Sequence, residues 1–168
     1  MEHRTTDLLA LAEQLARERH AGQTDKAGAA YWMHPQRVSQ GCASDEARIA
    51  GWLHDLIEDT DTTAEELLTL GFPPDVVAAV QLDTRRPDES YMDYIQRIVD
   101  ACDSQDPAVA CAGRIAREVK MSDLRDNMNL DRLPTVTDTD RARVEKYRAV
   151  YSVLENSCAP APGIDATR

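Results

Sequence analysis

The chain has 168 residues, which is enough for one domain with a buried core, and its composition is 42% hydrophobic, 29% charged, with a formal net charge of −11. Long-range repulsion therefore argues against a nucleic-acid or anionic-membrane partner, although a bound cation in a pocket can still attract a small anionic ligand. No apolar run approaches the ~20 residues that span a bilayer, and the N-terminus lacks the features of a signal peptide, so we expect a cytoplasmic protein.

The first part of the chain predicts one helix followed by a loop. Leu8, Leu11 and Leu15 recur at helical spacing, and Gly22 can end the helix. Residues 23–30, which are rich in small and polar side chains, are expected to form the loop.

Capping residues and prolines mark the starts of the later helices. The proline of His34-Pro35 suits the first turn of a short helix, and Ser44 can cap a helix over about residues 45–59. The other predicted starts are Thr63 with Glu66 in a capping box, Pro73-Pro74, Ser90, Asp106-Pro107, and Thr137 or Thr139.

These elements predict an all-α fold, because no segment alternates like a strand for long. We expect a single domain of about seven to eight helices over residues 1–155 and a flexible tail over residues 156–168. The cysteines lack the close spacing of a zinc-thiolate site, so free thiols are expected at Cys42, Cys102, Cys111 and Cys158.

The stretch His-Asp-Leu-Ile-Glu-Asp at 54–59 places its ionisable side chains on one arc of a helix. With His54 at zero on a helical wheel, Glu58 falls at about 40°, Asp55 at about 100° and Asp59 at about 140°. Three carboxylates without a Lys or Arg repel one another, which favours a bound cation. Imidazole and carboxylate together suit Mn, Fe, Zn or Ni, which activate bound water. A solvated acidic helix face is the alternative interpretation.

Glu58 and Asp59 lie one turn beyond His54 and Asp55, where they are placed for general-base work or for orienting the attacking water.

A second group of polar residues lies near the middle of the predicted helix that follows Pro107. Lys120, Asp123 and Asn127 share one face, and a partly buried Asp123 would need a metal or Lys120 as its partner. An exposed Lys–Asp pair is the alternative. His34 and His20 both remain candidates for a further metal ligand on this reasoning.

Three motifs in this order resemble the hydrolase half of RelA/SpoT proteins and the stand-alone small alarmone hydrolases, such as the metazoan SpoT homologue. The motifs are HAGQTDKAGAAYWMHP (20–35), HDLIEDTDTT (54–63) and KMSDLRDN (120–127), within a match over roughly residues 7–155. The resemblance implies an HD-domain helical bundle and hydrolysis of (p)ppGpp at its 3′-pyrophosphate, without synthesis, in the stringent response.

The same resemblance implies a role for individual residues. It assigns the metal ligands to the His-Pro motif, the His-Asp pair and the third motif, with Mn²⁺ as the typical ion: His34, His54, Asp55 and Asp123. His20 then becomes a supporting residue. The catalytic acidic pair falls on Glu58 and Asp59, and the candidate substrate contacts are Lys26, Lys120, Asn127 and Tyr147. Tyr147 also belongs to the apolar stripe of the last helix, so packing is its alternative role.

The chain departs from the family pattern around the expected nucleobase. Asp25 stands where the family has an Arg that stacks on guanine, Ala29-Ala30 replaces Glu-Pro, and Asn129 replaces a frequent Arg. Losing the stacking cation removes cation–π attraction, which gives weight to a phosphohydrolase for another nucleotide, such as a nucleotidase or a pppApp-type hydrolase. A non-catalytic nucleotide-binding regulator is the third hypothesis. In each case the partner is a small nucleotide.

Overall fold

The computed structural model describes residues 2–157, and helices account for most of this part of the chain. The elements are α1 (Glu2–Arg19), α2 (Met33–Gln40), α3 (Asp45–Leu53), α4 (Leu56–Asp59), α5 (Ala64–Thr69), α6 (Pro74–Asp83), α7 (Tyr91–Cys102), α8 (Pro107–Met128), the 3-10 helix η1 (Leu130–Arg132) and α9 (Asp138–Asn156). Extended pairing in the described residues is limited to one isolated bridge between Thr24 and Ala30. The all-α prediction is confirmed.

The predicted capping residues begin the helices as expected. Ser44 accepts a hydrogen bond from the backbone N of Ala47, and Thr63 accepts one from Glu66. Thr137, rather than Thr139, caps α9 and forms a reciprocal capping box with Asp140. These side-chain oxygens satisfy backbone N–H groups that have no partner within the helix.

The predicted helix over residues 45–59 is interrupted at His54 and Asp55, which separate α3 from α4. Asp55 has φ −92° and ψ −6°, and helical hydrogen bonding resumes with Asp59 N donating to Asp55 O at 2.8 Å. The helical-wheel angles apply to an unbroken helix. In the structure, the turn at His54 and Asp55 sets the angle between these two side chains instead.

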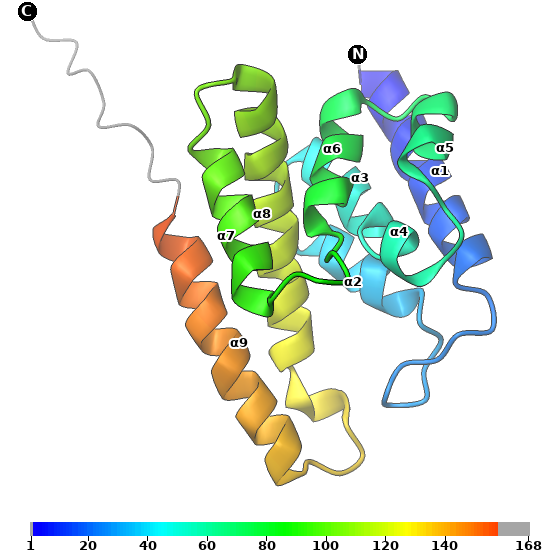
Figure 1. Ribbon diagram of the computed structural model, residues 1–168. Helices are drawn as coiled ribbons and strands as arrows, with labels where there is room; N and C mark the ends of the chain where they lie inside the picture. The colour runs from blue at the N-terminus through cyan, green and yellow to red at the C-terminus, as the bar shows by residue number, and fades with distance from the viewer. Residues whose placement is uncertain (1, 158–168) are drawn as a thin grey trace, which may run out of the picture.

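The long helix α8 lies at the centre of the fold and packs against α2, α3, α6, α7 and α9. Figure 1 shows α7, α8 and α9 as three neighbouring helices, with α1, α3, α5 and α6 gathered beside them. The core between these helices is built from fully buried aliphatic side chains such as Leu53, Leu56, Ile95, Ile98 and Leu124. Burial of this apolar surface is the main term that holds the helices together.

Two close contacts bring α2, α3 and α8 together. A Cβ added at Gly51 of α3 would lie 2.9 Å from Ser39 Cα of α2, so this crossing requires glycine. Ser122 of α8 donates a hydrogen bond to the Val38 carbonyl of α2 at 2.8 Å. As a result, the three helices that carry the candidate metal ligands are held side by side.

Several remaining predictions concern the ends and the thiols. Helix α9 extends to Asn156, the first residue of the tail predicted over 156–168, and the residues after Ser157 lie outside the described part. Cys42 and Cys111 carry free thiols, as expected, and Cys102 is buried, whereas Cys158 lies outside the described part. None of the helices described combines the length and the apolar character that crossing a membrane requires.

Candidate active site

Two histidines and one aspartate from three helical segments meet in the interior. His34 of α2, His54 at the end of α3 and Asp123 of α8 each offer one ligand atom, and these atoms lie within 4.8 Å of one another. All three side chains are buried. Two imidazoles and a carboxylate form a donor set that suits a first-row divalent metal ion.

His54 indicates that a cation belongs in this cluster. Its Nδ1 donates to the Gly51 carbonyl at 2.8 Å, which leaves the lone pair of a neutral ring on Nε2. This buried Nε2 has no hydrogen-bond partner among the described residues and lies 3.1 Å from Asp55 Oδ2. A lone pair facing a carboxylate is repulsive unless a proton or a metal ion lies between them.

Asp55, the fourth predicted ligand, lies beside both imidazoles but outside the group of three. Its Oδ2 is 3.1 Å from His54 Nε2 and 3.6 Å from His34 Nε2. The same oxygen accepts a hydrogen bond from the Tyr31 hydroxyl at 2.8 Å. Burial alone would raise the pKa of Asp55, but the positive charge that His54 and His34 carry when they are protonated outweighs it and lowers the pKa. Asp55 is therefore an anion next to the cluster.

Lys120 and Asn127 both hold the carboxylate of Asp123. Lys120 Nζ donates to Asp123 Oδ2 at 2.8 Å and lies 5.1 Å from the centre of the Tyr94 ring, while Asn127 Nδ2 donates to Asp123 Oδ1. Burial would raise the pKa of Asp123, but the Lys120 ammonium and the hydrogen bond from His34 outweigh it and lower the pKa. The Lys120 side chain is only 13% exposed, so water screens its charge little and the ammonium stabilises the ionised form of Asp123.

His34 is surrounded by carboxylates. Its Nε2 lies 3.1 Å from Asp123 Oδ1, and its Nδ1 donates to Asp126 Oδ2 at 2.7 Å. Burial alone would lower the pKa of His34, but the hydrogen bonds to Asp123 and Asp126 and the charge of Asp55 raise it to about 10. Without a metal, the cluster therefore attracts a proton to the position that a metal ion would take.

The two candidate catalytic carboxylates differ in their surroundings. Asp59 Oδ2 is 3.3 Å from the Tyr31 hydroxyl, which also donates to Asp55, so Asp59 lies next to the cluster. Burial and the nearby charge of Asp55 raise the pKa of Asp59. Glu58 instead accepts a hydrogen bond from the backbone N of Arg85 at 3.0 Å. The structure thus brings Asp59 to the cluster and directs Glu58 to the segment after α6.

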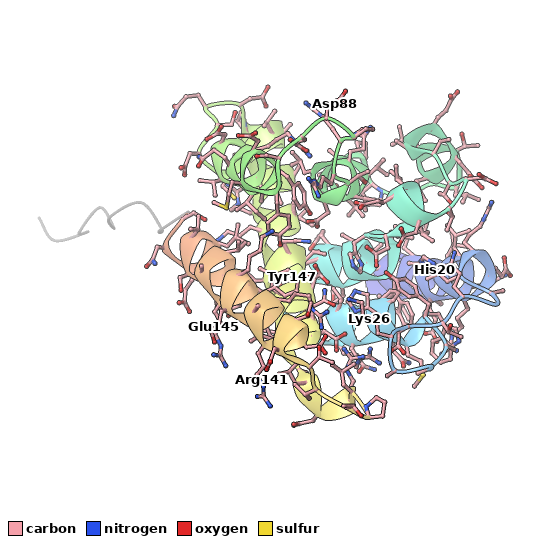
Figure 2. The ribbon with its side chains drawn as sticks, turned by 60° about the horizontal axis from the view of Figure 1, so that its bottom comes forward. His20, Lys26, Asp88, Arg141, Glu145 and Tyr147 are labelled. Carbon is pink, nitrogen blue, oxygen red and sulfur yellow. The ribbon has the colours of Figure 1, made fainter. Side chains whose placement is uncertain are left out.

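A pocket of about 300 Å³ adjoins His34 and contains three of the four predicted substrate contacts: Lys26, Asn127 and Tyr147. In Figure 2, Tyr147 on α9 and Lys26 on the loop before α2 face the same region although they are far apart in the chain. The Tyr147 ring lies 6.4 Å from that of Tyr91 and packs on the core, so Tyr147 both lines the pocket and supports α9. Lys120 lies outside this lining.

Asp25, which replaces an expected cation, is not a free charge in the pocket wall. Its Oδ1 accepts hydrogen bonds from the backbone N of Ala27 and of Ala29, both at 2.9 Å, and so closes the loop. Its Oδ2 lies 3.3 Å from Arg132 Nη1. Arg132 and Arg143 line the same pocket, so positive side chains remain there despite the change at position 25.

Three further residues belong to the site although no sequence pattern had indicated them: Tyr31, Asp126 and Arg132. Tyr31 and Asp126 stand inside the motifs that contain His34 and Asp123, and Asp126 follows Asp123 by three residues on the same helix face. That spacing was a usable signal for Asp126. His20 is buried, donates from Nδ1 to Gln23 Oε1 at 2.8 Å and packs against the Tyr31 ring, and it is not a member of the group of three.

Sequence comparison finds relatives for part of the chain. No protein-family model matches it. The guanosine-3′,5′-bis(diphosphate) 3′-pyrophosphohydrolase of Aquifex aeolicus is 43% identical over 60 residues, which are 33% of this chain and 9% of the relative. The protein of the same name from Spiroplasma citri is 41% identical over 63 residues, covering 35% of this chain and 8% of the relative. The aligned segments are thus a small part of both relatives.

Structural comparison covers nearly all of the chain. A solved structure of a metazoan ortholog of SpoT, a protein that hydrolyzes ppGpp, superposes with a TM-score of 0.69 over 89% of this chain and 86% of that chain, at 22% sequence identity. The chain has the SpoT-type HD fold. The resemblance that the three motifs predicted is confirmed at the level of this fold, and the SpoT-type fold accounts for the meeting of α2, α3 and α8 around the histidines.

Proposed function

We propose that this chain is a metal-dependent phosphohydrolase that removes the 3′-pyrophosphate of a (p)ppGpp-type nucleotide in the cytoplasm. The observation that carries the proposal is the buried group of His34, His54 and Asp123, with Asp55 beside it, at the edge of a nucleotide-sized pocket. The curated relatives are named for this activity, and the neighbouring solved structure is of a protein that hydrolyzes ppGpp.

The donor set fits a divalent metal ion, and we propose Mn²⁺ held by His34, His54, Asp55 and Asp123. Two nitrogens and two oxygens suit Mn²⁺ as well as Fe²⁺, Zn²⁺ and Ni²⁺. When bound, such an ion supplies Lewis acidity for the phosphoryl group and lowers the pKa of a water ligand. The unpartnered Nε2 of His54 supports this assignment, because it needs a cation in place of the missing hydrogen bond.

The remaining residues of the site orient the substrate and handle the proton. Asp59, whose pKa is raised, accepts a proton from the attacking water, and Glu58 holds the neighbouring segment in place. Lys26 and Tyr147 contact the nucleoside. Asn127 lines the same pocket, donates to the Asp123 carboxylate and contacts the nucleotide beside it. Lys120 keeps Asp123 ionised and in position. Water attacks the phosphorus, and the bond from the ribose 3′ oxygen to that phosphorus breaks. The 3′ oxygen takes up a proton from solvent, which gives GDP and pyrophosphate.

A substrate screen with purified protein tests this proposal. With Mn²⁺ and ppGpp, we expect release of GDP and pyrophosphate, separated by anion-exchange chromatography, and loss of that release in His54→Gln. Glu145→Gln is the control, since Glu145 lies on the exposed face of α9 and pairs with Arg148. Turnover of pppApp, NTPs or NMPs instead would indicate the second hypothesis, for which Asp25 in the pocket wall is the reason. Binding without turnover under every metal would indicate a regulator.

A further inference from the structure

Asp126 is a buried carboxylate beside the candidate metal cluster with no role in the proposed reaction. Its side chain is only 8% exposed. Arg37 Nε donates to its Oδ1 at 2.6 Å, and Arg132 Nη2 donates to its Oδ2 at 3.1 Å. Two guanidinium groups therefore hold this carboxylate ionised and fix its plane, because Arg–carboxylate contacts are directional.

The third partner of Asp126 is the imidazole of His34. His34 Nδ1 donates to Asp126 Oδ2 at 2.7 Å, while Nε2 of the same ring faces Asp123 and Asp55. A proton held on Nδ1 leaves the lone pair on Nε2, which is the nitrogen turned toward the metal cluster. A carboxylate behind a metal-bound histidine fixes the tautomer and the ring orientation and makes the ligand more basic.

The contacts continue from Asp126 to the wall of the nucleotide pocket. Arg132 reaches both the backbone O of Asp126, at 3.0 Å, and Asp25 Oδ2, at 3.3 Å. Asp25 in turn holds the backbone of Ala27 and Ala29 in the loop that carries Lys26. An uninterrupted chain of polar contacts thus runs from this loop through Arg132 and Asp126 to His34.

We propose that Asp126 is a positioning residue that orients His34 for the metal ion, and that Arg132 couples this orientation to the Asp25 loop of the pocket. The inference rests on the metal site of the proposed function. It goes beyond the proposed function because the Asp25 loop, which contains no candidate ligand, would then influence the affinity of the protein for metal. A purely structural ion cluster would hold the helices together without changing the affinity of the folded protein for metal.

Titration calorimetry with Mn²⁺ on folded, metal-free protein tests the role of Asp126. We expect Asp126→Asn to bind Mn²⁺ about 10–100-fold more weakly than the wild type, the usual cost of losing such a partner. Asp131→Asn, an exposed carboxylate five residues further along the chain, is the matched control and should bind as the wild type does. Unchanged affinity in Asp126→Asn, with circular dichroism showing a folded protein, overturns the proposal.

The coupling to the pocket has its own variant. Asp25→Asn should weaken Mn²⁺ binding less than Asp126→Asn but measurably more than the Asp131→Asn control, although Asp25 touches no candidate ligand. Wild-type affinity in Asp25→Asn overturns the coupling. Absence of Mn²⁺ binding by the wild type overturns both this inference and the proposed metal site, whereas Mn²⁺ binding without nucleotide turnover contradicts the proposed function alone.

Nitrogen-15 NMR of the histidine rings gives a readout that requires no change at Asp126. In the Zn²⁺-loaded wild type, which is diamagnetic, the His34 ring should carry its proton on Nδ1, with the signal assigned by its loss in His34→Gln. The result overturns the proposal if the proton is on Nε2. This measurement can overturn the proposal even if Asp126→Asn does not fold.

Discussion

At the scale of single residues, Tyr31 links the two carboxylates that the proposed reaction uses in different ways. Its hydroxyl lies 2.8 Å from Asp55 Oδ2 and 3.3 Å from Asp59 Oδ2. A phenol has one proton to donate, and this hydroxyl lies closer to Asp55. Burial of Asp59 and the neighbouring charge of Asp55 raise the pKa of Asp59. The ring itself is held by His20 and His34, at centroid distances of 4.9 and 5.8 Å.

Tyr31→Phe should lower kcat about 10–100-fold with little change in KM, because it removes a hydrogen bond to the site and keeps the ring packing. Steady-state kinetics with ppGpp and Mn²⁺ measure both constants. Tyr151→Phe is the control, since Tyr151 is a partly buried tyrosine that packs on the core through α9. Equal kcat in wild type and Tyr31→Phe would show that the hydroxyl has no part in the reaction.

The site residues differ in how far the sequence could predict them. His34, His54 and Asp123 lie in the three motifs, and the family resemblance of these motifs implied a metal site, whereas residue types and spacing alone left His34 and His20 as alternatives. The partner of His34 Nδ1 is Asp126, which lies 92 positions away in the chain, and the partner of Asp25 is Arg132, 107 positions away. Neither pairing leaves a local signal, because only the packing of α2, η1 and the loop on α8 creates it.

At the scale of the elements, the turn between α3 and α4 and the crossing of α2 with α3 place the ligands. The turn lets His54 donate to Gly51 O while Asp55 faces both histidines. The crossing depends on Gly51, where a Cβ would lie 2.9 Å from Ser39 Cα and 3.0 Å from Ser39 N. Backbone atoms cannot move aside as a flexible side chain would.

Gly51→Ala should therefore destabilise the protein by about 1–3 kcal/mol through overpacking. It should also weaken Mn²⁺ binding by the folded form, because the added Cβ pushes α2, and His34 with it, away from His54. Gly113→Ala is the comparison, since its Cβ would meet Cys102 N at 2.4 Å in the α7–α8 crossing, remote from the ligands. Urea unfolding and calorimetry measure the two quantities. Comparable metal affinity in both variants would contradict a positioning role for the α2–α3 crossing.

At the scale of the whole molecule, α8 is both the central helix of the core and the helix that carries several residues of the candidate site. It contacts α2, α3, α6, α7 and α9, and it carries Asp123, Asp126 and Asn127 on the part of the helix that faces the histidines. The protein has a net charge of −11, and several of the carboxylates that contribute to it lie close together in the buried cluster. A bound dication should therefore stabilise the entire fold rather than one loop.

A Mn²⁺ concentration about 100-fold above Kd should stabilise the protein by about 2.7 kcal/mol, which corresponds to a rise in Tm of about 5–10 °C for a domain of this size. The rise should be larger at pH 8 than at pH 6 for the same Mn²⁺ concentration. The pKa of His34 is raised to about 10 without metal, so its proton must be displaced, and displacement becomes easier as the pH rises. Scanning calorimetry with and without EDTA measures the shift.

His54→Gln should show no Mn²⁺-dependent rise in Tm at either pH, because it lacks one ligand of the cluster. A rise of the same size at pH 6 and pH 8 in the wild type would contradict the protonated state assigned to His34.

The sequence by itself determined the all-α class, the capped starts of the helices and the three motifs, because these depend on periodicity and on short spacings along the chain. The candidate metal ligands came from the resemblance that the motifs carry, since spacing alone left His34 and His20 open. Only the tertiary structure decided that the helix over residues 45–59 breaks at His54-Asp55, that Lys120 serves Asp123 outside the pocket, and that Asp25 is paired with Arg132. These outcomes depend on which side chains meet across helices distant in sequence, and that is settled by packing and burial rather than by local pattern.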